Sequence, residues 1–150
     1  MPDTFSKLIY HVIFGTKHRE PLITPALREE LYRYVAGIVR GQDGVLFEIG
    51  GVPDHVHVVV QIRPDTAVAE MVRLIKANSS KWANERPDSP GRFSWQRGYG
   101  AFTVSLSQLE GVREYVRNQE QHHRRRTFQE EFVEFLNRHG IEFDERYLWD

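Results

Sequence analysis

The sequence predicts an α+β protein in which an antiparallel sheet is backed by helices, a ferredoxin-like or RRM-like arrangement. Two observations support this prediction. Segments rich in β-branched and aromatic residues alternate with segments whose apolar residues keep helical spacing. Their order along the chain is strand, helix, strand, strand, helix, strand, helix, which is typical of a split β-α-β fold. A fold of this kind does not by itself indicate a function.

Four segments are predicted to form the strands of the sheet. They span residues 5–16, 45–52, 54–62 and 95–106, and the middle two form a hairpin around Pro53. Their β-branched and aromatic side chains favour a pleated backbone. The segment 84–92 carries Pro87, Pro90 and Gly91, so we expect it to be a loop.

Capping residues mark where helices begin. Thr24-Pro25 predicts a helix that continues to about residue 41, and Pro64-Asp65-Thr66 predicts a second helix. Two capping boxes follow, Ser107-x-x-Glu110 and Thr127-x-x-Glu130. The first predicts a third helix that runs unbroken to about residue 125. The second predicts a short helix that ends near residue 139.

The composition is that of an ordinary globular domain. The 150 residues are 40% hydrophobic and 27% charged, which is enough for one core. We find no segment long and apolar enough for a membrane span and no secretory signal pattern, so we expect a cytoplasmic protein without a membrane partner. The chain contains no cysteine, which excludes disulfides, thiolate zinc sites and cysteine nucleophiles.

The net charge of −1 hides an uneven distribution. Residues 1–126 carry 18 Lys and Arg against 14 Asp and Glu, whereas residues 127–150 carry 2 against 7. We treat the first segment as the main body of a single domain and the second as its acidic C-terminal helix and tail. A basic body is compatible with nucleic-acid binding, because phosphate contacts need local positive charge. An ordinary solvated surface would show the same balance.

His55 and His57 are candidate metal ligands. Side chains two residues apart in a strand project from the same face, so the two imidazoles point together while the intervening Val56 points the other way. Two neutral imidazoles at this spacing can bind one divalent ion. A pair of surface histidines on a half-exposed strand would give the same pattern.

A second candidate pair lies on the predicted third helix. Tyr115 and Gln119 are four residues apart and therefore share one helical face. Taken alone, a tyrosine on an apolar helical stripe is usually part of the core. A carboxamide oxygen from Gln119 beside two imidazoles would leave metal positions open, and such oxygens favour Mg²⁺ or Mn²⁺.

His55-Val56-His57 followed by Tyr115-x-x-x-Gln119 resembles the motif pair of the HUH tyrosine transposases of the IS-two-hundred insertion-sequence family, whose relatives include the REP-associated tyrosine transposases. Residues 10–19, 76–82 and 95–102 resemble this family's first strand, second helix and last strand. The resemblance covers nearly the whole chain. An ordered set of motifs is far more specific than any single one of them.

The resemblance implies a mechanism and a substrate. A divalent metal, Mg²⁺ or Mn²⁺, would be held by His55, His57 and Gln119 and would polarise a scissile phosphate. Tyr115 would attack it, leaving a 5′-phosphotyrosine and a free 3′-hydroxyl. No nucleotide cofactor would be required, because the covalent link conserves the phosphodiester energy. The partners implied are single-stranded DNA with hairpin structure and a second copy of the chain, in a homodimer with shared active sites.

Basic and aromatic side chains are candidate DNA contacts, since single strands are held by a mixture of charge and stacking surfaces. Trp82, Trp95 and Tyr99 are the candidate stacking residues, although we expect the tryptophans to be core residues. The candidate phosphate contacts are Lys17, Arg19, Arg73, Lys76, Lys81, Arg97 and Arg124.

His122 and His123 return to about the helical face of Tyr115. We interpret them as the start of a solvated basic helix end; the alternative is that they compete with Gln119 as metal ligands. For the whole protein, three other hypotheses stay open. They are another HUH nuclease such as a replication initiator or relaxase, a non-catalytic single-strand nucleic-acid-binding module, and a transposase that is intact but no longer mobile.

Overall fold

The computed structural model describes residues 4–123 and 125–149, and it has the predicted α+β architecture. Four strands form one antiparallel sheet in the order β2-β3-β1-β4, the strand order of a ferredoxin-like fold. The strands are β1 (Ile9–Gly15), β2 (Val45–Val52), β3 (His55–Gln61) and β4 (Gly100–Thr103). The helices are α1 (Pro25–Gly41), α2 (Val68–Glu85), α3 (Leu109–Arg117), α4 (Gln119–His122) and α5 (Phe128–Arg138).

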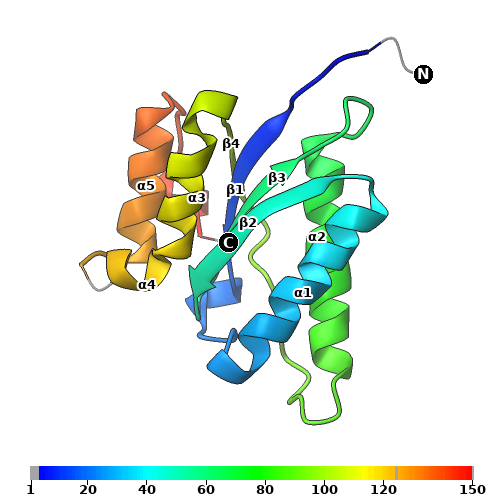
Figure 1. Ribbon diagram of the computed structural model, residues 1–150. Coiled ribbons are helices and arrows are strands. Elements are labelled where there is room, and N and C mark those ends of the chain that lie inside the picture. Colours follow the sequence, from blue (N-terminus) through cyan, green and yellow to red (C-terminus); the bar gives the residue numbers. More distant parts are fainter. Residues whose placement is uncertain (1–3, 124, 150) are drawn as a thin grey trace.

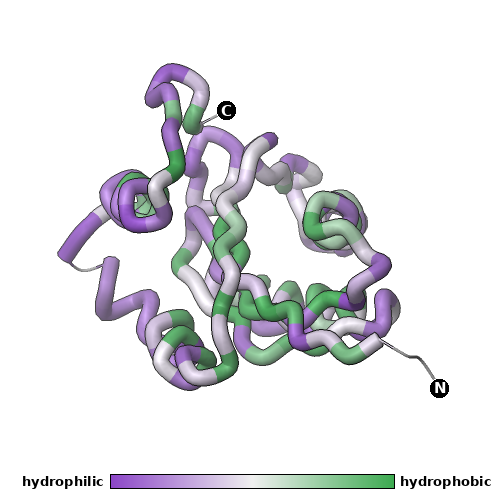
Figure 2. The backbone as a smooth tube through the Cα atoms, turned by 90° about the horizontal axis from the view of Figure 1, so that it is seen from above, coloured by the Kyte–Doolittle hydropathy of each residue, from purple (hydrophilic) through white to green (hydrophobic). Residues whose placement is uncertain are grey.

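Helices cover both faces of the sheet (Figure 1). The long helices α1 and α2 pack on one face, and α3, α4 and α5 lie on the other. Figure 2 shows the backbone from above, with hydrophobic residues in the central segments and also on the helices. No helix within the described part of the chain is long and apolar enough to cross a membrane.

Strand β3 has a different role on each face. Val56, Val58 and Val60 are buried in the large core beneath α1 and α2. His55 and His57 alternate with these valines and therefore project to the opposite face, where they are also fully buried. The predicted alternation is confirmed, but the histidines are not on an exposed surface. Because β3 is a central strand with partners on both sides, its backbone holds them rigidly.

The predicted strand 95–106 is shorter in the structure. Only Gly100–Thr103 pair with β1, and Trp95 forms an isolated bridge with Thr16. The intervening segment is irregular, because the Lys76 ammonium donates hydrogen bonds to the backbone carbonyls of residues 96–98. Trp95 is only 8% exposed, which confirms it as a core residue. The first strand is also shorter than predicted, beginning at Ile9.

The helix caps agree with prediction in two of the four motifs. The Thr24 hydroxyl accepts a hydrogen bond from the Leu27 amide, and the capping box of Thr127 and Glu130 is complete. The predicted box at Ser107 is wrong, because a short 3-10 turn precedes α3 and no side chain caps that helix. The second helix begins later than predicted, at Val68, and extends through Glu85 into the predicted loop.

The prediction of one unbroken helix through Tyr115 to residue 125 is also wrong. The chain leaves helical geometry at Asn118, whose φ and ψ are −98° and 26°, and a short separate helix α4 follows. The carboxyl end of α3 packs tightly on β2 at this break. A Cβ added to Gly50 would lie 2.2 Å from the Val116 carbonyl oxygen. The break allows α4 to turn Gln119 inward, where it is 1% exposed.

Candidate active site

The two histidines of β3 are held by partners on their outer nitrogens. His55 Nδ1 donates to Asp54 Oδ1 at 2.7 Å. His57 Nδ1 lies 2.8 Å from Nε2 of His11, a buried residue of the neighbouring strand β1. In both cases the Nε2 atom is left facing the space beneath α4 and α5. Fixing one ring nitrogen in this way is how proteins orient metal-binding histidines.

Glu131 of α5 lies at the centre of that space and is fully buried. Its Oε1 is 2.9 Å from His57 Nε2, 3.2 Å from His123 Nε2 and 3.5 Å from His55 Nε2. One donor atom from each of these four residues falls within 4.8 Å of every other. Three imidazoles and a carboxylate that converge so closely fit a divalent transition-metal ion in both donor chemistry and spacing.

Tyr115 meets the same cluster from α3. Its hydroxyl donates to Glu131 Oε2 and accepts from Arg126 Nη2 at 3.2 Å. Its ring stacks on His122 and lies edge-on to His57, with centroids 5.8 Å apart. A phenol, two strand histidines and a carboxylate of one chain are thus assembled in one place.

Gln119 also reaches the cluster, although the break at Asn118 places it on the short helix α4 rather than on the helix of Tyr115. Its Oε1 lies 3.3 Å from His55 Nε2 and 3.0 Å from His123 Nε2. Its amide nitrogen donates to the Tyr115 carbonyl at 3.2 Å. The structure therefore brings together all four site residues that the sequence predicted.

The cluster has an unusual distribution of charge. Burial works against charging His55, but the hydrogen bond to Asp54 and the contacts with Glu131 outweigh it and raise its pKa. Burial lowers the pKa of His57 to about 4 despite the neighbouring carboxylate. Burial alone would raise the pKa of Glu131, but hydrogen bonds from the three imidazoles place it far below its usual range. Burial, followed by the negative charge of Glu131, raises the pKa of Tyr115.

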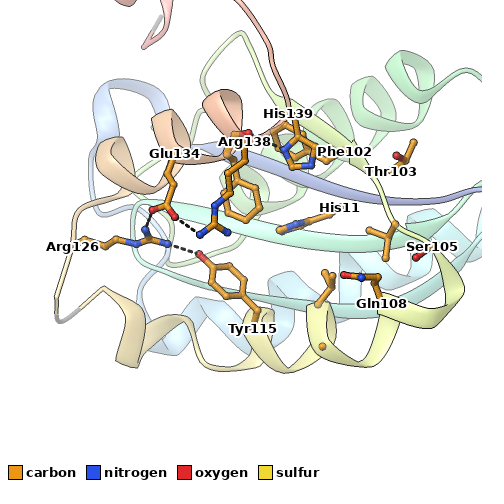
Figure 3. Close-up of a pocket in the computed structure, with 14 residues that line it drawn as sticks. His11, Phe102, Thr103, Ser105, Gln108, Tyr115, Arg126, Glu134, Arg138 and His139 are labelled. Carbon is orange, nitrogen blue, oxygen red and sulfur yellow. Dashed lines mark hydrogen bonds and ion pairs between the residues drawn. The ribbon is translucent and has the colours of Figure 1, made fainter.

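A pocket of about 550 Å³ opens beside the Tyr115 hydroxyl, between α3 and α5. His11 and Phe102 of the sheet form its floor, and Figure 3 shows Arg126 and Arg138 near its rim. Both arginines pair with Glu134. The pocket therefore combines aromatic surfaces with positive charge at the entrance to the tyrosine. A second opening leads to His123 from the side of Arg19.

The candidate phosphate contacts occupy two regions. Lys17 and Arg19 are exposed on the turn after β1, on the side that opens to His123. Arg73, Lys76 and Arg97 line a shallow pocket between α2 and the 94–99 segment, far from the cluster on the other face of the sheet. Exposed Lys81 is on α2, and Arg124 lies outside the described residues.

Two of these basic side chains already have protein partners. Arg73 forms an ion pair with Glu70, and the Lys76 ammonium donates to three carbonyls. Of the candidate stacking residues, Trp82 is half-buried against Tyr34, and Tyr99 is 36% exposed. Contact of any of these residues with DNA stays a prediction.

The sequence interpretation missed one member of the cluster, Glu131, and one outer partner, His11, and its preferred interpretation of a second member, His123, was wrong. His123 is not part of a solvated helix end, because its side chain is only 9% exposed and touches both Gln119 and Glu131. Glu131 was hidden among the acidic residues of the tail, and His11 among strand residues. A signal for Glu131 exists: it occupies the apolar stripe of α5, between Phe128 and Phe132. A lone carboxylate on a buried helical stripe indicates a partnered or functional group.

A strand-borne histidine pair that faces a helix-borne tyrosine fits the motif pair for which the sequence resembles the tyrosine transposases, a class of enzymes that cut and rejoin DNA. The sequence model of the family described as "Transposase IS200 like" matches residues 4–119. The chain belongs to this family. Family membership favours a transposase over the replication initiators and relaxases that the sequence alone left open. The match ends at Gln119, so His123 and Glu131 lie beyond it.

Individual relatives agree with this assignment. The chain is 23% identical over 120 residues to the ISDra2 transposase TnpA of Deinococcus radiodurans, an alignment that covers 75% of this chain and 84% of the relative. A crystal structure of a proposed transposase from Deinococcus radiodurans R1 superimposes with a TM-score of 0.61 at 23% identity, covering 79% of this chain and 95% of that one. A REP-associated tyrosine transposase bound to a REP hairpin superimposes with a TM-score of 0.58 at 12% identity, covering 77% and 68%.

Proposed function

We propose that this protein cleaves and rejoins single-stranded DNA at hairpin-bearing sites, with Tyr115 as the nucleophile and a divalent metal at the histidine pair. The observation that carries the proposal is the meeting of Tyr115 and His57 on the two oxygens of one carboxylate, that of Glu131. Family membership supports the reaction class. The hairpin in the related structure supports the substrate class.

The chain's own residues account for positioning of the nucleophile. Glu131 and Arg126 hold the Tyr115 hydroxyl from two sides. Attack forms the bond from Tyr115 Oη to phosphorus and breaks the bond from phosphorus to the 3′-oxygen. The phenol gives up one proton and the departing 3′-oxygen takes one up to leave as a hydroxyl, so the step is balanced. The reverse attack by a 3′-hydroxyl releases Tyr115 and rejoins the strand.

The raised pKa of Tyr115 means that the phenol is protonated in the metal-free site at neutral pH. Attack therefore requires additional positive charge near the hydroxyl and the scissile phosphate. Lewis-acid polarisation of that phosphate is the chemistry that a divalent ion supplies at such a site. The three converging imidazoles and the Glu131 carboxylate would hold the ion. Arg126 would contribute a second, permanent charge.

The pocket beside Tyr115 provides a path for the strand. Its volume of about 550 Å³ is sufficient for a nucleotide, and Phe102 offers a surface for a base. Arg126 and Arg138 would face the phosphates at its rim (Figure 3). We assign the more distant Arg73 and Arg97 to the hairpin stem, whose duplex can extend across a larger area of surface than the cleaved single strand.

Tyr115 lies beside the histidines of its own chain, which supports an active site formed within one chain. We therefore propose that cleavage proceeds within one chain. A homodimer stays a prediction, as does a cytoplasmic location. Active sites shared between two chains, which the resemblance implies, are the alternative to this proposal.

The direct test is incubation of the purified protein with single-stranded hairpin oligonucleotides and Mn²⁺, followed by a denaturing gel. A labelled DNA band should shift to the mass of a protein conjugate, and Tyr115→Phe should abolish it while hairpin binding on a native gel is retained. Tyr10→Phe is the matched control, since Tyr10 packs against the core of the other face. Normal cleavage by Tyr115→Phe would exclude Tyr115 as the nucleophile.

A further inference from the structure

The C-terminal segment places two side chains in the histidine site that the family motif does not include. His123 follows α4, and Glu131 lies on α5. Both come after Gln119, the last residue of the family match. Since α5 packs on the sheet through Phe128, Phe132 and Leu136, its position over the histidines is fixed by a core of its own.

All three imidazoles of the cluster turn the same nitrogen inward. Nδ1 is engaged outside the cluster in each case: by Asp54 for His55, by His11 for His57 and by the Arg126 carbonyl, 2.9 Å away, for His123. The three Nε2 atoms are left converging on Glu131 Oε1. Outer hydrogen bonds that fix ring orientation and leave one nitrogen to the metal are typical of metal-bound histidine.

Gln119 is placed differently from these donors. Its amide nitrogen is committed to the Tyr115 carbonyl, and its oxygen lies against His123 and His55 rather than at the point where the donors converge on Glu131. A neutral amide oxygen is also a weaker ligand than a carboxylate, which carries a full charge to a divalent cation.

We propose that the divalent ion is held by four protein ligands, namely Nε2 of His55, His57 and His123 and the carboxylate of Glu131, with Gln119 as an outer residue that orients His123. This assignment rests on the proposed function for the presence of a metal. It replaces the predicted ligand set of two histidines and Gln119 with one that depends on the acidic C-terminal helix.

The spacing requires only a small adjustment. Ligand bonds of about 2.1 Å allow two donors on one ion to be at most about 4.2 Å apart. All pairs here are within 4.8 Å, so a pair of donors on opposite sides of the ion has to close by at most about 0.6 Å.

The ligand set also determines which metal is preferred. Mg²⁺ favours oxygen ligands and retains its water, whereas imidazole suits the first-row transition metals. Three imidazoles and one carboxylate should therefore bind Mn²⁺, Co²⁺ or Zn²⁺ far more tightly than Mg²⁺. Of the two ions expected from the sequence, this selects Mn²⁺.

A Co²⁺ titration of the metal-free full-length protein, followed by visible absorption and without DNA, tests the assignment. We expect one Co²⁺ to bind per chain and to give visible absorption bands. A roughly 100-fold excess of Mg²⁺ over Co²⁺ should not remove these bands. Glu131→Gln and His123→Ala should each weaken Co²⁺ binding on the order of 100-fold. Loss of a residue that only supports a ligand typically lowers metal affinity by about 10- to 100-fold, and loss of a ligand should lower it at least as much. Gln119→Ala should weaken it less than either.

Glu134→Gln is the matched control, because Glu134 lies one helical turn from Glu131 on α5 and pairs with arginines outside the cluster. The proposal is overturned if either Glu131→Gln or His123→Ala binds Co²⁺ within about threefold of this control, a difference too small for a lost ligand. Circular dichroism checks that each variant folds. If Glu131→Gln does not fold, Co²⁺ binding by His123→Ala, a change at a partly exposed residue, decides alone. Because no DNA is present, the result is independent of whether Tyr115→Phe cleaves.

Discussion

The Tyr115 hydroxyl donates a hydrogen bond to Glu131, whose other carboxylate oxygen accepts one from His57. A residue of the C-terminal helix thus connects the proposed nucleophile with the histidine pair. Without α5, nothing among the described residues would fill the centre of the cluster. The acidic tail, which has no evident role in the sequence, is therefore part of the site.

His57→Ala should abolish cleavage and the stabilisation of the protein by metal, while leaving the chain folded. The variant should stay folded although less stable without metal, because Glu131 loses one buried partner but keeps His55 and His123. Mn²⁺ at 100 times its dissociation constant should stabilise the wild type by about 2.7 kcal/mol. Thermal unfolding with Mn²⁺ and with chelator measures the difference, and an equal rise in the melting temperature of His57→Ala would place the metal elsewhere.

Gly50→Ala should destabilise the protein by about 1–3 kcal/mol, the usual cost of overpacking, because the new Cβ would lie 2.2 Å from the Val116 carbonyl oxygen. The displaced α3 carries Tyr115, so cleavage should also be lost. Gly111→Ala, on the same helix, is the control: its Cβ meets nothing within 4 Å and should add about 0.8–1 kcal/mol of helix propensity. Urea unfolding of both variants checks this, and equal stabilities would mean that α3 can shift freely on β2.

Arg126→Gln and Arg97→Gln should affect different steps. Arg126 touches the Tyr115 hydroxyl, so its loss should slow single-turnover cleavage even at saturating DNA. Arg97 is remote from the cluster. Its loss should weaken hairpin binding and reduce the salt dependence of the binding constant by about one unit, with the saturated rate unchanged. A slower saturated rate in Arg97→Gln would disprove the proposed division between strand and stem contacts.

The stability of the metal-free protein should depend on pH through His55. The folded state raises the pKa of His55, with Asp54 as its main partner. A raised pKa contributes stability that is complete below the unfolded value of about 6.5 and is lost as pH rises through the folded value. In chelator, the free-energy advantage of the wild type over Asp54→Asn should therefore shrink from pH 6 towards pH 9. Unfolding at several pH values tests this; an advantage that grows with pH would contradict the assigned charge.

The strand order and the histidine alternation could be predicted because they depend on local periodicity. Val56, Val58 and Val60 mark one face of β3, which fixes where His55 and His57 point. Strand length was less predictable. Residues 95–106 have the composition of a strand, but how many of them pair with β1 depends on the Lys76 ammonium. Lys76 lies on α2, and its ammonium binds the carbonyls of the residues that follow Trp95.

The break at Asn118 and the position of Glu131 could not be predicted in the same way. The sequence from 109 to 122 has no proline and suits a continuous helix; the break accompanies the close packing of Val116 on Gly50, a contact between distant segments. Glu131 has acidic neighbours at 130 and 134, and composition does not distinguish it from them. Only its position on the apolar stripe of Phe128 and Phe132 distinguishes Glu131 from its acidic neighbours. This position becomes informative about the site once α5 is known to pack over the histidines.

The most direct test of the proposed chemistry is mass spectrometry of the protein–DNA conjugate after nuclease and trypsin digestion. Cleavage after Arg113 and Arg117 releases the peptide 114–117, which contains Tyr115 and no other hydroxyl side chain. We predict that this peptide carries a nucleotide linked through its 5′-phosphate to Tyr115. A nucleotide on any other residue, or cleaved DNA with no covalent conjugate at all, would contradict the assignment of Tyr115 as the nucleophile.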